Sequence, residues 1–233
     1  NVPVSDDNLS AMQKVLADQA VGEGLAAVND YQSIVTLLSQ ADSALTALTL
    51  VGDSTNPTDL NTVDELTFAS MGADNVSVNN LASIKDALVN TPNTLTSLED
   101  VQAVVDSYNA ILAVAADDGT DPSIATPSAA DYANIGISLD AEQTLQDTQV
   151  AVLKGALAAT NPAGADTVAE VQDLVNAATR VLKNATGATE MIDDGSGNLV
   201  STPIVVSKTE LELLGNVPVS DDNLSAMQKV LAD

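Results

Sequence analysis

Two acidic segments that contain glycine hold the side chains best suited to chemistry in this sequence. The first reads Asp-Asp-Gly-Thr-Asp and the second Asp-Asp-Gly-Ser-Gly-Asn. Carboxylate and amide oxygens that alternate around a glycine turn can wrap Ca²⁺, which takes several oxygen ligands in a flexible loop. Neither segment has the closing glutamate of an EF-hand loop. The candidate ligands are Asp117, Asp118, Asp121, Asp193, Asp194 and Asn198.

The same two segments could also be ordinary turns that bind no metal. Asp and Gly are the residues that ordinary turns use, so the composition favours solvated links over a Ca²⁺ site. The segment Glu190–Val206 equally fits a small β-hairpin around Asp194 and Gly195, because apolar and β-branched residues flank that turn. Gly195-Ser196-Gly197 lacks the lysine and the apolar helix of a phosphate-binding loop. Calcium is therefore the one cofactor that the sequence suggests.

The composition excludes many classes of protein. The chain has no Cys and no His, which removes disulfides, thiolate chemistry and the commonest general base. It has 33 acidic against 7 basic residues, a net charge of −26 that repels nucleic acid and anionic lipid. Acidic pairs therefore arise from composition, and none is marked as a catalytic pair. No apolar run approaches the ~20 residues of a membrane-spanning helix. We expect no enzyme, no nucleic-acid partner and no membrane insertion.

The strongest architectural signal is a repeat. Residues 1–18 recur letter for letter as residues 216–233. The chain therefore reads as one 215-residue period of a tandem array followed by the opening of the next period. It begins with Asn rather than Met, so we expect the natural protein to start elsewhere.

A weaker repeat lies inside the period. Gly72, Gly136 and Gly215 each follow an apolar pair spaced i, i+3, which predicts a short first helix with a glycine C-cap. A leucine follows nine residues later each time and opens a second helix, and a third amphipathic segment begins after a Gly or Pro breaker. Four pairs have the spacing of a capping box: Thr62 with Glu65, Ser128 with Asp131, Thr167 with Glu170, and Ser207 with Glu210.

These patterns predict an all-α fold, a tandem array of three-helix bundle modules with three modules per 215-residue repeat. Apolar stripes at helical spacing predict the core, with Tyr31, Tyr108 and Tyr132 packed into it. The second helix of module C has the weaker stripe Leu145, Thr148 and Val152. For module B the expected core is Leu81, Ile84, Leu88, Val105, Ile111 and Leu112. The expected boundaries are 1–52 for the second and third helices of module A, 60–116 for module B, 128–190 for module C, and 204–233 for the first and second helices of the next module A.

One module resembles a known family. A short helix ending at Tyr132–Ser138, a second helix, and Thr-Val-x-x-Val-x-x-Leu-Val at Thr167–Val175 resemble the GA-type three-helix module of bacterial surface proteins. That family includes albumin-binding modules. The resemblance implies the fold and a bacterial cell-surface setting. Albumin binding is not carried over, because its contact residues cannot be matched one by one.

The repeat and the charge together point to a structural role. A very acidic, cysteine-free, repeated chain looks like the extender of a giant adhesin or a surface filament. We therefore expect a non-enzymatic repeat unit of an extracellular fibre, adhesin extender or lattice, whose partners are the neighbouring repeats. Head-to-tail self-association is also expected. The alternative is a repeated module that binds a host or neighbouring-cell protein with avidity.

Overall fold

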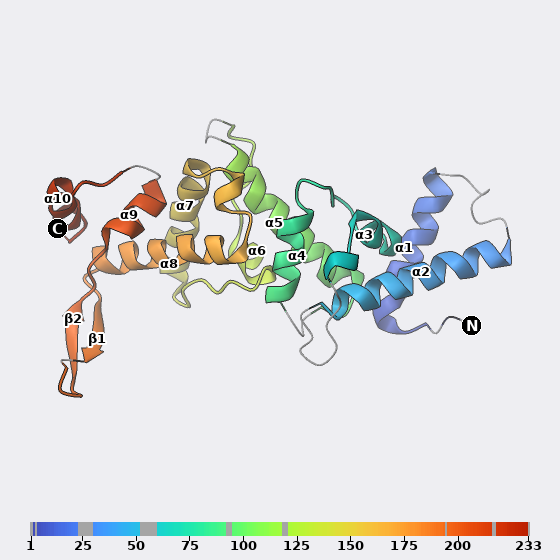
Figure 1. Ribbon diagram of the computed structural model, residues 1–233, viewed down its shortest axis with the longest axis horizontal. Helices are drawn as coiled ribbons and strands as arrows, with labels where there is room; N and C mark the ends of the chain where they lie inside the picture. Colours follow the sequence, from blue (N-terminus) through green and yellow to red (C-terminus); the bar gives the residue numbers. More distant parts are fainter. Residues whose placement is uncertain are drawn as a thin grey trace. The chain divides into compact units, whose positions relative to one another are not determined.

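The computed structural model describes residues 2, 4–22, 30–51, 60–91, 95–117, 121–193, 195–215 and 218–232 (Figure 1). These residues form ten α-helices and one two-stranded antiparallel sheet. The expected all-α class is therefore correct in outline, with a hairpin added. The helices are α1 Asp6–Gly22, α2 Tyr31–Thr49, α3 Glu65–Met71, α4 Leu81–Asn90, α5 Leu98–Ala116, α6 Ala129–Asn134, α7 Gln143–Ala159, α8 Val168–Ala185, α9 Lys208–Gly215 and α10 Asp221–Ala232; the strands are β1 Thr189–Asp193 and β2 Leu199–Pro203.

Local signals set most helix ends. Thr167 and Glu170 form the predicted capping box of α8, and Ser207 and Glu210 bond each other at the start of α9. Gly72 ends α3 with φ of 88°, a left-handed conformation that glycine adopts without strain. The predicted box of Thr62 with Glu65 is wrong, because Thr62 lies in a 3-10 turn.

Asp64 caps α3 in its place. Its side chain accepts a hydrogen bond from the backbone N–H of Thr67, and the Thr67 hydroxyl closes the box. This hydrogen bonding lowers the pKa of Asp64. The cap therefore starts two residues later than the sequence pattern indicated.

The described chain divides into two compact units, and the division falls within α5 and at the end of α6. The first unit is 1–109 with 134–136, and the second is 110–133 with 137–233. In the first unit α1 packs on α2, and α3 packs on both (Figure 1). In the second unit α7, α8 and α9 pack on one another, and α10 packs on α8.

The packing groups each predicted first helix with helices that precede it in the chain. In each unit the predicted first helix of one module, α3 or α9, packs on the predicted second and third helices of the module before it. The segment just before it is bonded by the second helix that follows: Lys85 Nζ donates to the Val63 carbonyl at 3.0 Å, and Gln228 Nε2 donates to the Val206 carbonyl at 2.7 Å. Helices α3 and α9 therefore have neighbours both before and after them in the chain. The module boundaries themselves stay a prediction.

The predicted core of module B is largely correct. Ile84, Leu88, Val105 and Ile111 are fully buried. Leu81 and Leu112, which begin and flank the stripes, are half-buried instead.

The predicted stripe of α7 is wrong by about one residue. Leu145 and Val152 are half-buried, whereas Leu153 and Leu157 are fully buried. Gln149 takes a core position because its Nε2 donates to Thr179 Oγ1 at 2.6 Å. A polar residue at a core position hides the register from an apolar pattern.

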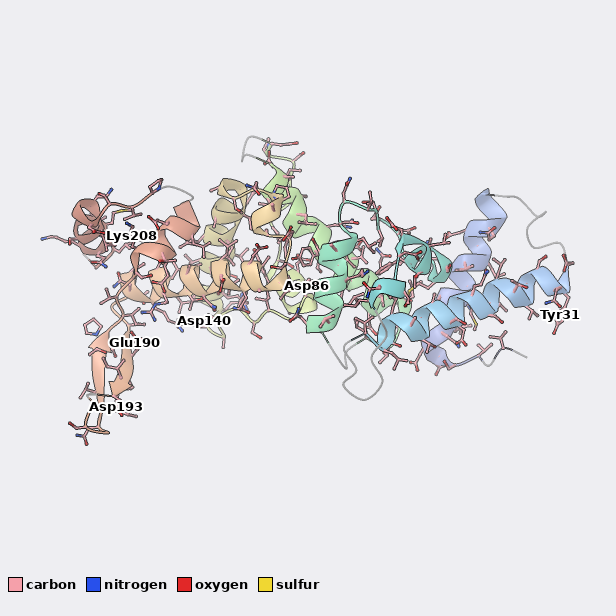
Figure 2. The ribbon with its side chains drawn as sticks, viewed as in Figure 1. Tyr31, Asp86, Asp140, Glu190, Asp193 and Lys208 are labelled. Carbon is pink, nitrogen blue, oxygen red and sulfur yellow. The ribbon has the colours of Figure 1, made fainter. Side chains whose placement is uncertain are left out.

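The three tyrosines divide. Tyr108 and Tyr132 are fully buried, as predicted. Tyr31 is 74% exposed, so its predicted place in the core is wrong. It is the first residue of α2, and Figure 2 shows it at the free end of that helix, whereas the buried part of α2 runs from Ala41 to Leu48. Periodicity predicts which face of a helix is buried, but it does not predict which part of the helix's length other elements cover.

Candidate functional site

The first acidic loop uses its carboxylates to hold a turn. Asp117 Oδ1 accepts a hydrogen bond from the backbone N–H of Asp121 at 3.3 Å. Asp121 Oδ1 accepts from the backbone N–H of Ser123 at 2.8 Å, and hydrogen bonds from the Ser123 side chain and backbone lower the pKa of Asp121. Asp118 lies outside the described residues. The Asp121 bond is that of an Asx turn, and the Asp117 carboxylate bonds the backbone four residues further on.

The second acidic loop is the tip of the hairpin, where Figure 2 labels Asp193. Asp193 Oδ1 accepts from the backbone N–H of Gly195 at 2.8 Å and of Gly197 at 3.0 Å. Asn198 also has an interaction partner, and Asp194 lies outside the described residues. Across the described ranges no three acidic side chains gather as a metal would require. Calcium binding by either loop stays a prediction.

The hairpin that the sequence offered as an alternative is present. Thr189 pairs with Pro203 and Asp193 with Leu199. The strands end before Ile204–Val206, which the pattern had included. Both faces are open to solvent, and the exposed apolar side chains of the strands are Met191, Ile192, Leu199 and Val200.

The single arginine of the chain anchors the base of this hairpin. Arg180 on α8 pairs with Glu190 of β1 at 3.2 Å and with Glu210 of α9 at 2.7 Å. Its Nη2 also donates to the Val205 carbonyl at 3.0 Å. The hydrogen bond to Glu190 raises the pKa of Arg180. A guanidinium suits this role because its donors fan out in one plane. The hairpin base is thus fixed, and the apolar side chains of its strands are exposed.

A groove of about 640 Å³ lies between α2 and α3. Hydroxyl groups line much of it, but they are used by their own helices. Thr36 donates to the Gln32 carbonyl and Ser70 to the Leu66 carbonyl. Such groups offer a ligand little fixed hydrogen-bonding capacity, so the groove does not define a binding site.

The most informative surface is the repeated segment itself, which the sequence predicted to be the second helix of module A. In the first copy Ala11, Met12 and Val15 are buried, Val15 to 6% exposure. In the second copy Ala226 is exposed and Val230 is 77% exposed. Identical side chains therefore lie in a core in one place and in solvent in the other.

The start of the same segment shows the reverse difference. Val4 is 61% exposed in the first copy, whereas its equivalent Val219 is 2% exposed. Gln13 is exposed, whereas its equivalent Gln228 is half-buried and bonds the Val206 carbonyl. The positions that are buried in one copy are therefore exposed in the other. Taken together, the two copies define a helix with a partner on each side.

Comparisons with protein-family models, with curated proteins and with solved structures found no match for this chain. Within the described residues no helix is long and apolar enough to cross a membrane.

Proposed function

We propose that this chain is a non-enzymatic structural repeat unit of a bacterial surface fibre, adhesin extender or lattice, built as a tandem array of three-helix modules. The observation that carries the proposal is the repeated 18-residue segment, whose two copies have complementary covered surfaces. A helix with one partner before it and another after it is a joint between repeats. Stacked repeats are stabilised through such nearest-neighbour joints.

The exposed apolar residues support a structural role over a repeated binding face. A ligand-binding face copied in each module would place apolar residues at matching positions. Leu66 is 71% exposed in α3, yet the matching positions counted from the module glycine are Ala130 and Thr209. Val78 is 78% exposed, and one of its matching positions is Asp221.

The charge fits an extended array. At −26 per chain, neighbouring arrays repel one another, and salt or divalent cations would screen that repulsion. A surface extender needs this property because it must stay apart from its neighbours while it spans a distance.

Small-angle scattering tests the array. We expect polypeptides of two, three and four 215-residue periods to gain the same increment in maximum dimension with each added period. A maximum dimension that grows only as the cube root of mass would show a compact assembly and contradict the proposal. The cell-surface setting is tested separately, with antibodies against the chain on intact native cells. Labelling that appears only after the cells are opened would contradict that setting.

The hairpin supports the alternative function, avidity toward a host or neighbouring-cell protein. It offers one anchored hairpin with exposed apolar strand residues per period, and many such hairpins in one array would bind far more tightly than one. Beads coated with four-period polypeptides should then adhere to target cells more than four times as well as beads with one period. Replacing Met191 and Leu199 by Ser should abolish adhesion but leave the scattering dimensions unchanged. Adhesion that survives this change would remove the hairpin as the binding element.

A further inference from the structure

The repeated helix has two stripes of covered residues, and each copy shows one of them. In α1 the buried residues are Asn8, Ala11, Met12 and Val15. In α10 the half-buried residues are Leu224, Met227, Gln228 and Leu231, the equivalents of Leu9, Met12, Gln13 and Leu16. Since each residue turns the helix by about 100°, the centres of the two stripes lie roughly 100° apart, and only the methionine belongs to both. A helix with one neighbour needs one stripe, so this helix is built for two.

The stripe of α1 is covered by helices that follow it in the chain. Met12 and Val15 form a buried cluster with Ala41 of α2. Beside it, Asn8 Nδ2 donates to Asp42 Oδ1 at 2.6 Å.

Helix α3 adds a contact next to that stripe. Lys14 Nζ pairs with Asp74, just after α3, at 3.1 Å. The Lys14 side chain lies against Gly72, where an added Cβ would come within 2.9 Å of it. These contacts show what the first copy needs from the chain that comes after it.

The stripe of α10 is covered by elements that precede it in the chain. The helix packs on α8, and Gln228 Nε2 donates to the Val206 carbonyl at 2.7 Å. Just before the helix, Val219 is buried. The residues that α1 uses toward α2 and α3 are exposed in this copy: Asn223, Ala226, Lys229 and Val230. The two sets of partners therefore use different residues of the same helix and do not compete for one face.

We propose that in the tandem array each copy of the repeated helix binds both sets of partners at once: α8 of the period before it, and α2 and α3 of the period that it opens. The inference rests on the proposed array but goes beyond it, because periods could also be joined by free linkers. The Asn223 amide then donates to the following period's equivalent of Asp42, and Lys229 pairs with the equivalent of Asp74. Consecutive periods thus share one helix and form one continuous core.

A helix that is covered on two faces resists unfolding more than a helix covered on one. It has to break the contacts of both faces before it opens, and in stacked repeats such nearest-neighbour contacts add to stability. Backbone amides report this directly, because their hydrogen exchange requires local opening. The exchange rate of the shared helix is therefore the quantity that distinguishes a continuous core from linked, independent periods.

Hydrogen exchange followed by NMR on a two-period polypeptide tests this. Residues 216–233 then lie in the middle, and segmental isotope labelling separates the identical copies. We expect the amides of residues 221–232 to exchange at least tenfold more slowly there than those of both α1 and α10 in the 233-residue chain. A rate equal to the slower of those two would overturn the proposal, because the helix would then use one set of partners at a time.

Matched substitutions on the two stripes assign the effect. In the two-period polypeptide, Ala226→Asp should return the exchange rate to that of α10, and Leu224→Asp should return it to that of α1. In the 233-residue chain Ala226→Asp should leave the exchange of α10 unchanged, because Ala226 is exposed. Slow exchange that survives either substitution in the two-period polypeptide would overturn the proposal.

The outcome is separable from the scattering test of the array. Slow exchange in an assembly whose maximum dimension grows only as the cube root of mass would support the shared helix and contradict the extended array. An extended array whose middle helix exchanges as fast as α1 or α10 would overturn the shared helix alone.

Discussion

The first 12 residues of α1 are identical to the 12 residues of α10, and the two helices have different surroundings. Both start at the same place, because Ser5 and Ser220 cap them alike: each hydroxyl accepts a hydrogen bond from the N–H three residues on, at 3.4 and 3.3 Å. Val15 is nevertheless buried and Val230 is 77% exposed. Helix formation is thus a local property of the segment. Burial depends on the partner helices, which are α2 and α3 for α1 and α8 for α10.

The largest expected difference in stability between the two copies comes from substituting a methionine that is packed in the core in only one of them. Met12→Ala should lower the free energy of unfolding by about 2–5 kcal/mol, because Met12 is 3% exposed within the α1–α2 cluster. Met227→Ala should cost less than about 1 kcal/mol, because Met227 is only half-buried. Urea unfolding measures both. Equal losses would mean that the two helices are equally covered.

Next in size is the buried amide. Asn8→Ala should cost about 1–3 kcal/mol, because it removes a hydrogen bond to the charged acceptor Asp42. Asn223→Ala should cost less, because Asn223 is exposed. With Asp42→Ala already present, the difference between the two substitutions should shrink, and the hydrogen bond from the Ser5 N–H to Asn8 Oδ1 accounts for what remains. A difference of undiminished size in this background would show that Asp42 is not the cause.

In the third prediction the second copy loses more stability than the first. Val219→Ala should cost about 1–2 kcal/mol, because Val219 is 2% exposed and loses two buried carbons. Val4→Ala should change stability by less than about 0.5 kcal/mol, because Val4 is 61% exposed. Thermal unfolding of the two variants checks this. If Val4 proved the costlier, the second copy would not be the one with a partner before it.

The smallest expected effect concerns calcium. If the acidic loops bind Ca²⁺, millimolar Ca²⁺ should raise the Tm and slow protease cleavage at Asp117 and Asp193 relative to chelator. Both loops lie outside the repeated segment, so the rise should be equal in the unchanged protein and in Met12→Ala. Unchanged Tm and cleavage would identify the loops as solvated turns.

Local signals explain what could be predicted. The glycine at the end of α3, the capping box of α8 and the hairpin turn depend on neighbours a few residues away, and the sequence displays them directly. Predictions failed where a distant group decides. Gln149 enters the core because Thr179 Oγ1 and the Val175 carbonyl accept hydrogen bonds from its side chain.

The candidate site follows the same rule. The acidic loops were visible as turns because Asp and Gly form them locally. The different surroundings of the two copies could not be predicted, because two identical segments give identical patterns. Only exposure distinguishes Ala11 from Ala226.

The sequence by itself determined that this protein is helical, repeated and strongly acidic, and it determined where the repeated helix begins, because each of these depends on composition or on contacts within one turn. The tertiary structure alone decided which face of that helix is covered, because α2 and α8 approach it from different parts of the chain. It also decided that Arg180 ties the hairpin to α8 and α9, since Glu190 and Glu210 meet it only after folding.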